Sequence, residues 1–287
     1  MNFLYGMNQA MQYIEKNLTE EIDYGKAASF TGYSAGYFQR VFHCIADMTL
    51  TEYIKKRKMT LAALDLQNSN LRVIDLAMKY GYESADSFTR AFQSIHGVNP
   101  SVVRTQGYMV KSFAPIRFHI SIEGAMEMKY RIEKRKAMRI VGQIRHYKAP
   151  NNSPQDVNTF WNEVFSNGMY EKIAALSNQD PKGVHGFLQV IDESTVDYII
   201  ATVTDQKVPR GLEEFTVPES EWAIFEAIGP VQHSLEELWK RIFDEWFPSS
   251  NYQHAETMEI ECFQSDGNRG SSNFHCEIWV PVRKCES

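Results

Sequence analysis

The sequence has little cysteine and no long apolar segment. Its 287 residues include four cysteines, at positions 44, 262, 276 and 285, with no Cys-x-x-Cys pair and no framework spacing. This usage is typical of a reducing cytosol rather than of a secreted scaffold. No segment offers the roughly eighteen apolar residues of a membrane span, and the first residues carry no charged leader. We therefore expect a soluble, cytoplasmic protein with no membrane partner.

The common signatures of enzymes are also missing. The sequence contains no phosphate-binding loop, no Ser-His-Asp order of a catalytic triad and no signature around a nucleophilic cysteine. A metal site built from His275, Glu277 and Glu259 would match no standard ligand spacing. We expect no metal, no cofactor and no catalytic residues.

The formal net charge of −6 is unevenly distributed along the chain. Counted from the sequence, residues 1–110 carry +1, residues 111–150 carry +7 and residues 151–287 carry −14. A near-neutral first part, a basic connecting segment and an acidic last part predict at least two domains with separate partners. Because phosphate repels acidic surfaces, we do not expect the last part to contact DNA.

One pattern near the amino terminus occurs twice. Ala28-x3-Gly32-x5-Phe38-x-Arg40-x-Phe42 recurs as Ala77-x3-Gly81-x6-Phe88-x-Arg90-x-Phe92. Each copy predicts two short helices around a glycine turn, which is the arrangement of a helix-turn-helix. The apolar spacing predicts helices from Asn8 to near Asn17 and over about 23–30, 34–45, 50–67, 73–80 and 84–96.

The second helix of each unit is the candidate for DNA contact. Two units joined by one rigid helix suit successive major-groove segments on the same face of DNA, about 34 Å apart. Arg and Gln can pair with guanine and adenine edges, whereas Ser and Lys mostly hold phosphate. The alternative is that these are ordinary solvated helix faces. The candidates are Ser34, Gln39, Arg40, Arg57, Ser84, Asp86, Ser87, Arg90 and Gln93.

These residues resemble the DNA-binding domain of AraC/XylS-type transcriptional regulators. The resemblance is to the MarA, SoxS and Rob group in particular, which implies binding to double-stranded promoter DNA as a monomer, with RNA polymerase as a partner. Two departures are Gly36, where the group has a large aromatic residue, and Asp47, where glycine is usual. The matching segments are Gly32-Tyr33-Ser34, Phe38-Gln39-Arg40-Val41-Phe42, Tyr53-Ile54-Lys55-Lys56-Arg57, Gly81-Tyr82-Glu83-Ser84, Phe88-Thr89-Arg90-Ala91-Phe92 and Asn99-Pro100.

Past Pro100 the apolar period changes from 3.6 to 2. We expect residues 1–108 to form the DNA-binding domain, 109–126 a linker or docking strand, and 127–287 a second domain. Strand pairs are predicted at 130–133 with 138–142 and at 215–218 with 222–225. Each pair is followed by a helix containing Trp-x-x-[Val/Ile]-Phe and by two further strands, 184–191 with 196–204 and 258–263 with 274–282. The predicted fold class is therefore multidomain: an all-α double helix-turn-helix domain, then an α+β domain of two strand-strand-helix-strand-strand repeats.

Strand alternation predicts acidic and aromatic side chains on one face of this second domain. His275, Glu277 and Trp279 would alternate away from the helices, and Glu261 and Phe263 of the neighbouring strand would lie beside them. Such a face suits a lipophilic cation, held by carboxylate charge and ring faces. The alternative is that the carboxylates are solvated and the aromatic rings belong to the core.

The second part resembles the GyrI-like, or multidrug-effector-binding, domain over about residues 127–284. The resemblance implies an SHS2-type duplication that binds bulky hydrophobic, often cationic compounds, with a buried Glu on a late strand as counter-charge. Glu261 or Glu277 would have that role, and Trp161, Phe187, Tyr198 and Trp279 would stack on the ligand. The matching segments are Val217-Pro218, Trp222-Ala223-Ile224-Phe225, Gly229-Pro230, Trp246-Phe247-Pro248-x-Ser250 and Glu277-Ile278-Trp279-Val280-Pro281-Val282.

These features predict a one-component transcription regulator, with activation as the expected effect. A lipophilic small molecule would bind the second domain and alter promoter binding, which requires unequal affinity for two conformations. Two alternatives remain open. The chain could be a ligand-independent activator with a structural tail. It could also be a hydrolase of reactive small molecules fused to a DNA-binding domain, because some relatives are implied to use the same Glu and a Tyr for hydrolysis.

Overall fold

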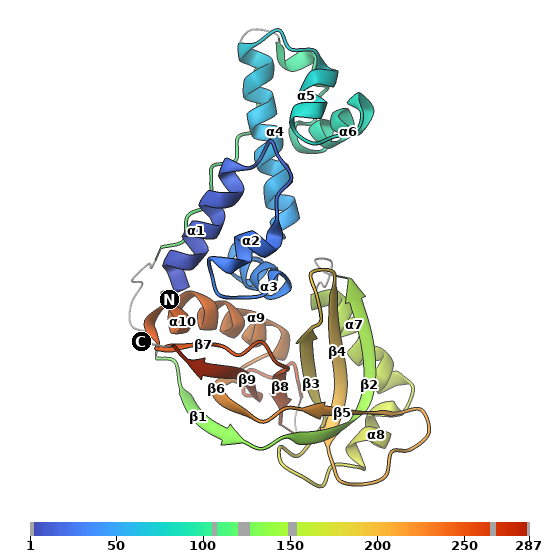
Figure 1. The fold of residues 1–287 in the computed structure, drawn as a ribbon. Coiled ribbons are helices and arrows are strands. Elements are labelled where there is room, and N and C mark those ends of the chain that lie inside the picture. Colours follow the sequence, from blue (N-terminus) through green and yellow to red (C-terminus); the bar gives the residue numbers. More distant parts are fainter. Residues whose placement is uncertain (1–2, 105–107, 120–126, 149–153, 265–267, 286–287) are drawn as a thin grey trace. The chain divides into compact units, whose positions relative to one another are not determined.

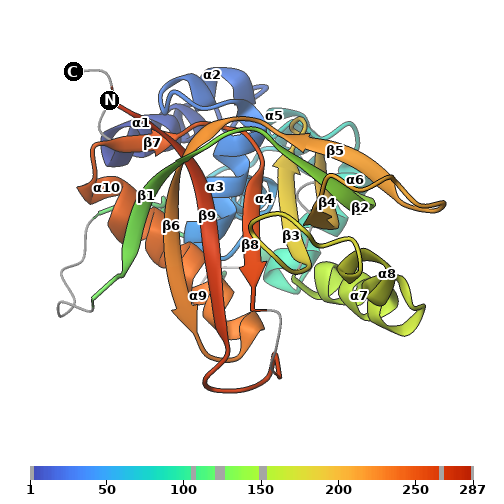
Figure 2. The same ribbon diagram turned by 90° about the horizontal axis from the view of Figure 1, so that it is seen from below.

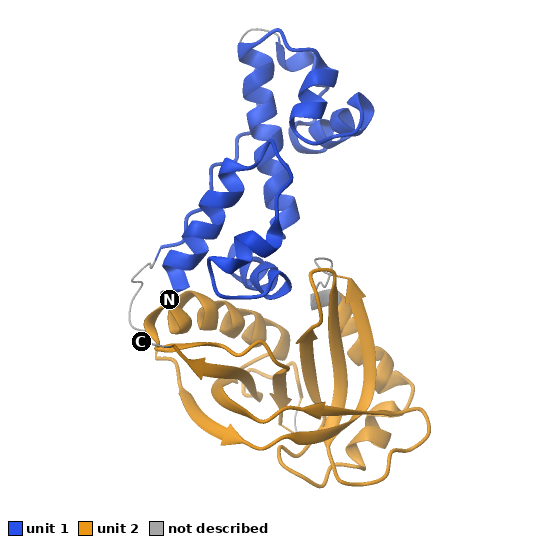
Figure 3. Cartoon of the chain, in the orientation of Figure 1, with its two compact units in different colours: residues 1–119 blue, residues 120–287 orange. Residues whose placement is uncertain are grey.

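The computed structural model describes residues 3–104, 108–119, 127–148, 154–264 and 268–285 (Figure 1). The chain divides into two compact units, residues 1–119 and residues 120–287 (Figure 3). Within the described residues, no helix is both long and apolar enough to cross a membrane. The first unit is all helical and the second is built on a sheet, as the change of apolar period predicts.

The first unit contains six α-helices among its described residues, and α4 joins its two halves. Helices α2 and α3 lie at one end of α4, and α5 and α6 lie at the other end (Figure 1). With 19 residues, α4 is roughly 28 Å long. The bounds are α1 Phe3–Lys16, α2 Tyr24–Ser29, α3 Ala35–Ala46, α4 Leu50–Asn68, α5 Val73–Lys79 and α6 Ala85–His96, followed by a 3-10 turn at Val102–Arg104.

Local signals set the two helix-turn-helix units. Gly32 and Gly81 both have positive φ, +76° and +79°, which side chains rarely adopt, so both predicted glycine turns are confirmed. The hydroxyls of Ser34 and Ser84 accept hydrogen bonds from the backbone N–H groups of Tyr37 and Ser87 and thereby cap α3 and α6. The predicted starts and ends of these helices therefore agree with the structure to within a residue or two.

Helix α1 begins earlier than its predicted start at Asn8. Gly6, normally a weak helix former, lies inside α1 and is buried. A Cβ atom at Gly6 would lie 2.6 Å from the carbonyl oxygen of Phe30. The glycine is thus needed for the close contact of α1 with the end of α2, and tertiary packing overrides its local preference.

Residues 108–119 pack on the helices of the first unit, and most of them belong to the segment 109–126 that the sequence predicts to be a linker or docking strand. The side-chain amide of Asn8 exchanges two hydrogen bonds with the backbone of Phe118, at 2.8 and 2.9 Å. The hydroxyls of Tyr53 and Thr60 accept hydrogen bonds from the backbone N–H groups of Ile116 and Phe113, both at 3.1 Å. Side chains of α1 and α4 therefore satisfy the backbone of this extended segment.

In its described residues, the second unit has nine strands in one sheet, with helices α7, α8, α9 and α10 (Figure 2). Helix α9 packs on β6 and β9, and α8 packs on β4. The strands are β1 Tyr130–Arg135, β2 Met138–Lys148, β3 His185–Val190, β4 Thr195–Val203, β5 Glu213–Val217, β6 Ser220–Ile228, β7 Tyr252–His254, β8 Glu259–Phe263 and β9 His275–Lys284. The helices are α7 Pro154–Ser166, α8 Met169–Ala174, α9 Val231–Arg241 and α10 Phe247–Ser249, with a π-helical turn at Ile242–Trp246.

The sheet order is β1-β6-β9-β8-β3-β4-β2-β5, with β7 beside β9. The predicted pairs β3–β4 and β8–β9 are confirmed, but the predicted pairs β1–β2 and β5–β6 are wrong. Both edges of β2 are taken, by β4 and β5, and both edges of β6 are taken, by β9 and β1. The first strand of each half of the domain therefore pairs with the other half, and β8 meets β3 in the middle.

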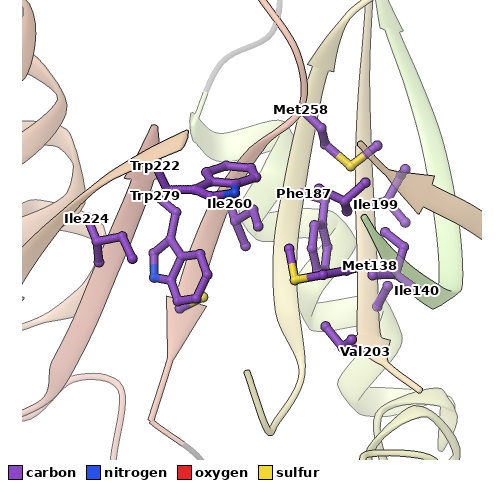
Figure 4. Packing of buried hydrophobic residues seen from close by; sticks show 13 residues of the cluster. Met138, Ile140, Phe187, Ile199, Val203, Trp222, Ile224, Met258, Ile260 and Trp279 are labelled. Carbon is purple, nitrogen blue, oxygen red and sulfur yellow. The ribbon is translucent and has the colours of Figure 1, made fainter. Parts of the chain in front are cut away.

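One apolar cluster fills a face of the sheet with side chains from both halves. Trp222 and Trp279 lie together at 6.0 Å between ring centroids, and Phe187 and Ile199 approach from β3 and β4 (Figure 4). Ile260 of β8 lies between the two groups (Figure 4). All five are buried, so this face forms a hydrophobic core of the unit, and the burial of such area stabilises the fold.

Candidate functional site

The predicted DNA contacts on α6 lie on its outer side. Asp86, Arg90 and Gln93 are exposed, whereas Phe88 and Phe92 of the same helix are fully buried. Gln93 donates a hydrogen bond to the side chain of Asn99. Helix α6 thus has one apolar face on the core and one polar face that DNA could reach.

On α3 the predicted contacts are less exposed. Gln39 and Arg40 are both half-buried, and Ser34 is exposed but caps the helix. In α6, the hydroxyls of Ser84 and Ser87 are hydrogen bonded to each other at 3.1 Å. The two recognition helices therefore offer different sets of side chains to a partner, in keeping with the departure at Gly36, which is buried.

Arg57 does not lie on an outer face, although the sequence placed it among the DNA contacts. Its Nε and Nη2 donate to the two carboxylate oxygens of Glu15, at 2.9 and 2.7 Å, and its Nη1 donates to the carbonyl oxygen of Phe113. The residue is 7% exposed, and the bond to Glu15 raises the pKa of the guanidinium. Arg57 therefore holds α1, α4 and the segment 108–119 together, and its burial contradicts the expectation that it lies on an outer face of the helix.

The predicted ligand residues of the second unit divide between the two faces of the sheet. The register pairs Glu261 with Ile278 and Cys262 with Glu277, so Glu261 and Glu277 point to opposite faces. The prediction that they lie side by side is wrong, because a one-residue difference in register exchanges the faces of a strand. Glu261, Phe263, Tyr198 and Trp161 meet on the face of α7 and α9, whereas Glu277, Phe187 and Trp279 belong to the opposite face.

Glu261 is the centre of a hydrogen-bonded cluster between the two halves of the domain. Its Oε2 accepts a hydrogen bond from the hydroxyl of Tyr198 at 2.7 Å, and its Oε1 accepts one from the indole of Trp239 in α9 at 3.2 Å. The indole of Trp161 in α7 donates to the Tyr198 oxygen at 3.1 Å. Two helices and two strands thereby converge on one carboxylate. We call Glu261, Tyr198, Trp161, Trp239 and Phe263 the Glu261 cluster.

Burial fixes the protonation of the tyrosine in this cluster. Tyr198 is 1% exposed, and desolvation, followed by the charge of Glu261, raises the pKa of its phenol well above the usual value. The phenol therefore stays protonated and acts as a donor to the carboxylate. Glu261 is half-buried, and Tyr198 and Trp239, which donate hydrogen bonds to it, are both neutral.

A glycine makes room for this arrangement. Gly186 of β3 pairs with Glu261 of β8. A Cβ atom at position 186 would lie 2.0 Å from the Tyr198 hydroxyl oxygen and 3.3 Å from Glu261 Oε2. The absence of a side chain at Gly186 is thus what lets the Tyr198 hydroxyl lie over the strand and reach the carboxylate.

A cation already lies on the rings of the cluster. The guanidinium carbon of Arg269 is 4.1 Å from the ring centroid of Trp161 and 4.3 Å from that of Phe263, and the two rings stand edge to face at 88°. Such distances are those of cation–π contacts. Burial lowers the pKa of the Arg269 guanidinium below its usual value, and the charge of Glu261 acts in the opposite direction.

Glu277 has a different setting on the opposite face. Nη1 and Nη2 of Arg131 donate to its two carboxylate oxygens at 2.7 and 3.3 Å, and the indole of Trp279 donates at 2.8 Å. Arg131 also bonds to Glu133, and Arg135 lies 5.1 Å from the ring of Trp279. The charge of Glu277 is therefore already neutralised by a protein cation.

Sequence reasoning missed Gly186, Trp239 and Arg269. A signal for Trp239 was present, because the Trp-x-x-[Val/Ile]-Phe motif occurs in both halves and Trp239 corresponds in it to Trp161. No pattern marks Arg269, which lies outside any strand or helix. Within the described residues, no group of three His, Cys, Asp or Glu side chains could hold a metal ion.

Comparison with known proteins matches both units. Residues 128–283 match the family model of the GyrI-like small molecule binding domain, which is more than half of the chain, and residues 27–106 match a helix-turn-helix domain model. The activator AarP of Providencia stuartii is 40% identical over 98 residues, which cover 34% of this chain and 73% of AarP. SoxS of Escherichia coli K12 is 33% identical over 92 residues, which cover 32% of this chain and 86% of SoxS.

Among solved structures, that of SAV2435 bound to tetraphenylphosphonium is similar to the second unit. Its TM-score is 0.51 at 22% identity, covering 54% of this chain and 94% of that chain, which supports the fold alone. The relatives of the helical unit are transcription regulators. The chain therefore belongs to the GyrI-like small-molecule-binding family and, through its helical unit, to the AraC-type regulators: it is a DNA-binding transcription regulator with an effector-binding domain.

Proposed function

We propose that the Glu261 cluster binds a lipophilic cation and that this binding changes how the helical unit engages promoter DNA. The observation that carries the proposal is the half-buried carboxylate of Glu261, hydrogen bonded by Tyr198 and Trp239 and bordered by the rings of Trp161 and Phe263. A carboxylate beside aromatic faces attracts an organic cation through charge and through the ring quadrupoles, and both attractions are stronger away from water.

The class of ligand has a second support. SAV2435, a protein of the same fold, is described as bound to tetraphenylphosphonium, a bulky cation covered by phenyl rings. Such an ion cannot donate hydrogen bonds and has no strongly hydrated charge. It therefore suits a site whose polar groups already satisfy each other and whose remaining surface is aromatic.

We propose Glu261 rather than Glu277 as the counter-charge of the ligand. Glu277 is bound in bidentate fashion by Arg131, so a ligand would have to compete with a strong charge-assisted pair. The hydrogen bonds to Glu261 from Tyr198 and Trp239 come from neutral donors, and they can persist when a cation approaches. Glu277 and Arg131 instead brace β9 against β1, two strands separated in the sheet by β6.

On the DNA side, we propose that α3 and α6 enter successive major-groove segments. The length of α4, roughly 28 Å, is close to one turn of DNA. Arg90, Gln93 and Asp86 of α6, with Ser84 and Ser87 at its start, and Gln39, Arg40 and Ser34 of α3 are the proposed contacts. Because AarP is an activator, we further propose activation with RNA polymerase as a partner, and no enzymatic step.

Calorimetric titration of the full chain with tetraphenylphosphonium tests the ligand site. Glu261→Gln keeps the size of the side chain and removes its charge. We expect it to weaken binding about tenfold to a hundredfold, since opposite charges roughly 6–10 Å apart attract each other by about 1.5–3 kcal/mol at an effective dielectric constant of about 20.

Glu277→Gln is the matched control, because it makes the same change on the opposite face of the sheet. We expect it to leave the affinity within about twofold of that of the unmodified chain, within ordinary measurement scatter. Unchanged binding by Glu261→Gln, or a loss with Glu277→Gln alone, would show that the counter-charge has been assigned to the wrong face.

A further inference from the structure

We propose that Arg269 is a built-in competitor of the effector: its guanidinium occupies the aromatic faces that a ligand cation needs, and the ligand binds by displacing it. The inference rests on the proposed function of the Glu261 cluster and adds a residue that sets its affinity and its preference for cations. A compound can then bind only if it interacts with these rings more favourably than the Arg269 guanidinium does.

The geometry of Arg269 is that of a bound organic cation. Its guanidinium carbon lies 4.1 Å from the ring centroid of Trp161, 4.3 Å from that of Phe263 and 5.1 Å from that of Phe165. Three aromatic residues from α7 and β8 thus share one cation. Trp161 also donates to the Tyr198 hydroxyl, which in turn donates to Glu261, so the rings under Arg269 are part of the proposed ligand site.

The attachment of the guanidinium is weak for a charge that is half-buried. Among the described residues, no carboxylate forms an ion pair with Arg269, and its contacts are to ring faces. Burial, in turn, disfavours the charged form of this side chain. A guanidinium that leaves the rings regains water, whereas a lipophilic cation that replaces it loses little hydration. The exchange therefore favours the ligand.

Only the side chain of Arg269 has to move. Its carbonyl oxygen accepts a hydrogen bond from the backbone N–H of Val231, the first residue of α9, at 2.9 Å. The neighbouring Asn268 side chain accepts one from the backbone N–H of Gly270 at 2.9 Å. These bonds can remain while the guanidinium turns away, so displacement requires a change of rotamer rather than a change of fold.

Charge also decides which compounds can displace Arg269. A cation gains the attraction of Glu261 when the guanidinium leaves, whereas an anion would have to approach that carboxylate. Tetraphenylphosphonium and tetraphenylborate have nearly the same shape and opposite charge, so a comparison of the two separates the effect of the ligand's charge from that of its aromatic surface. If Arg269 were instead a receptor for anions, the borate would bind and would depend on Arg269.

Calorimetry with Arg269→Gln tests the inference. We expect this variant to bind tetraphenylphosphonium about fivefold to tenfold more tightly than the unmodified chain, the size of a displaced cation–π contact. Arg283→Gln, a change of the same charge at an exposed residue of β9, is the control and should leave the affinity unchanged. Tetraphenylborate should gain no affinity in either variant.

Three outcomes have distinct meanings. The unmodified chain could bind tetraphenylphosphonium while Arg269→Gln binds it equally well or more weakly. This result would overturn the competitor role and give Arg269 a structural role instead. Tighter borate binding by the unmodified chain than by Arg269→Gln overturns it in favour of an anion receptor. Absence of phosphonium binding in both proteins contradicts the proposed function itself, and the competitor role with it.

A second measurement uses the unmodified chain and does not depend on the folding of a variant. Phenylglyoxal modifies accessible arginines, and peptide mass spectrometry can quantify the modification at each site. We expect tetraphenylphosphonium to increase the modification of Arg269 several-fold and to leave that of Arg283 constant. Protection of Arg269 by the phosphonium would mean that the guanidinium stays in place under the ligand.

Discussion

Replacement of Arg57 by alanine separates a structural role from a DNA contact. The guanidinium is bound to both carboxylate oxygens of Glu15 and to the carbonyl oxygen of Phe113. The side chains of Arg57 and Glu15 are 8% and 19% exposed. Arg57→Ala therefore leaves a largely buried carboxylate and a backbone carbonyl without these donors.

The expected cost follows from this environment. Removal of one partner of a buried ion pair costs about 3–5 kcal/mol. Tyr53 continues to donate to Glu15 at 2.6 Å, and Glu15 is not fully buried, so we expect the lower end, about 3 kcal/mol. The loss should appear in the free energy of unfolding of the first unit only.

The distribution of tryptophan makes this measurable in the full chain. All five tryptophans lie in the second unit, so their fluorescence during urea unfolding reports that unit, while circular dichroism at 222 nm is dominated by the helical first unit. We expect Arg57→Ala to lower the urea concentration at the midpoint of the dichroism transition and to leave the midpoint of the fluorescence transition unchanged.

The DNA-binding assay then distinguishes the two roles. A phosphate contact would leave both unfolding transitions unchanged and would reduce the slope of log affinity against log salt by about 0.9. That result would refute the structural assignment of Arg57. Arg90→Ala is the matched control, because Arg90 is exposed on α6 and its loss should weaken DNA binding without changing either transition.

Three further predictions concern single residues. Gly186→Ala should displace the Tyr198 hydroxyl from Glu261, because the new Cβ would lie 2.0 Å from it, and urea unfolding followed by tryptophan fluorescence should find the second unit destabilised by about 1.5–3 kcal/mol, the value of a hydrogen bond to a charged group. Asp47→Gly should stabilise the first unit by about 1 kcal/mol in urea unfolding, because Asp47 ends α3 with φ of 51°, a left-handed conformation that favours glycine. Burial lowers the pKa of His185 to about 4 in the folded protein, below its unfolded value of about 6.5. The free energy of unfolding should therefore be highest above pH 6.5, where His185 is neutral in both states, and should fall by about 3 kcal/mol in total as the pH falls toward 4.

Each of these predictions has an outcome that would contradict it. Unchanged stability of the second unit in Gly186→Ala would mean that the hydrogen bond of Tyr198 to Glu261 contributes little to the fold. Lower stability of Asp47→Gly would mean that the aspartate side chain contributes more than its backbone conformation costs. The unmodified chain should be less stable at pH 5 than at pH 7.5, and this difference should be smaller in His185→Gln. A difference of the same size in both proteins would mean that other groups cause the pH dependence of stability.

The helical unit could be predicted closely because its signals are local. Glycine turns at Gly32 and Gly81 and serine caps at Ser34 and Ser84 act within a few residues of the helices they define. Arg57 is the exception, because the sequence placed it among the DNA contacts and the structure buries it. Tyr53, Arg57 and Thr60 share one side of a helix by their spacing, and in the structure all three are buried.

The sheet could be predicted strand by strand but not in its pairing. The residues that make each strand are local, whereas the exchange of β1 and β5 between the halves depends on which edges other strands occupy. Parity within β8 and within β9 was readable from the sequence, but the register between them was not. Glu261 and Glu277 were therefore grouped although they lie on opposite faces. Arg269, in a segment without periodicity, left no signal of its own.

The most direct test of the account couples its two sites in one measurement. The affinity of the full chain for DNA, selected by the chain itself from a random library, is measured by mobility shift with and without saturating tetraphenylphosphonium. We predict that the ligand changes the affinity at least fivefold for the unmodified chain, within the range of allosteric coupling, and leaves it constant for Glu261→Gln at the same concentration. An equal change in both proteins, or no change in a chain that calorimetry shows to be saturated, would contradict the claim that a cation at Glu261 controls DNA binding.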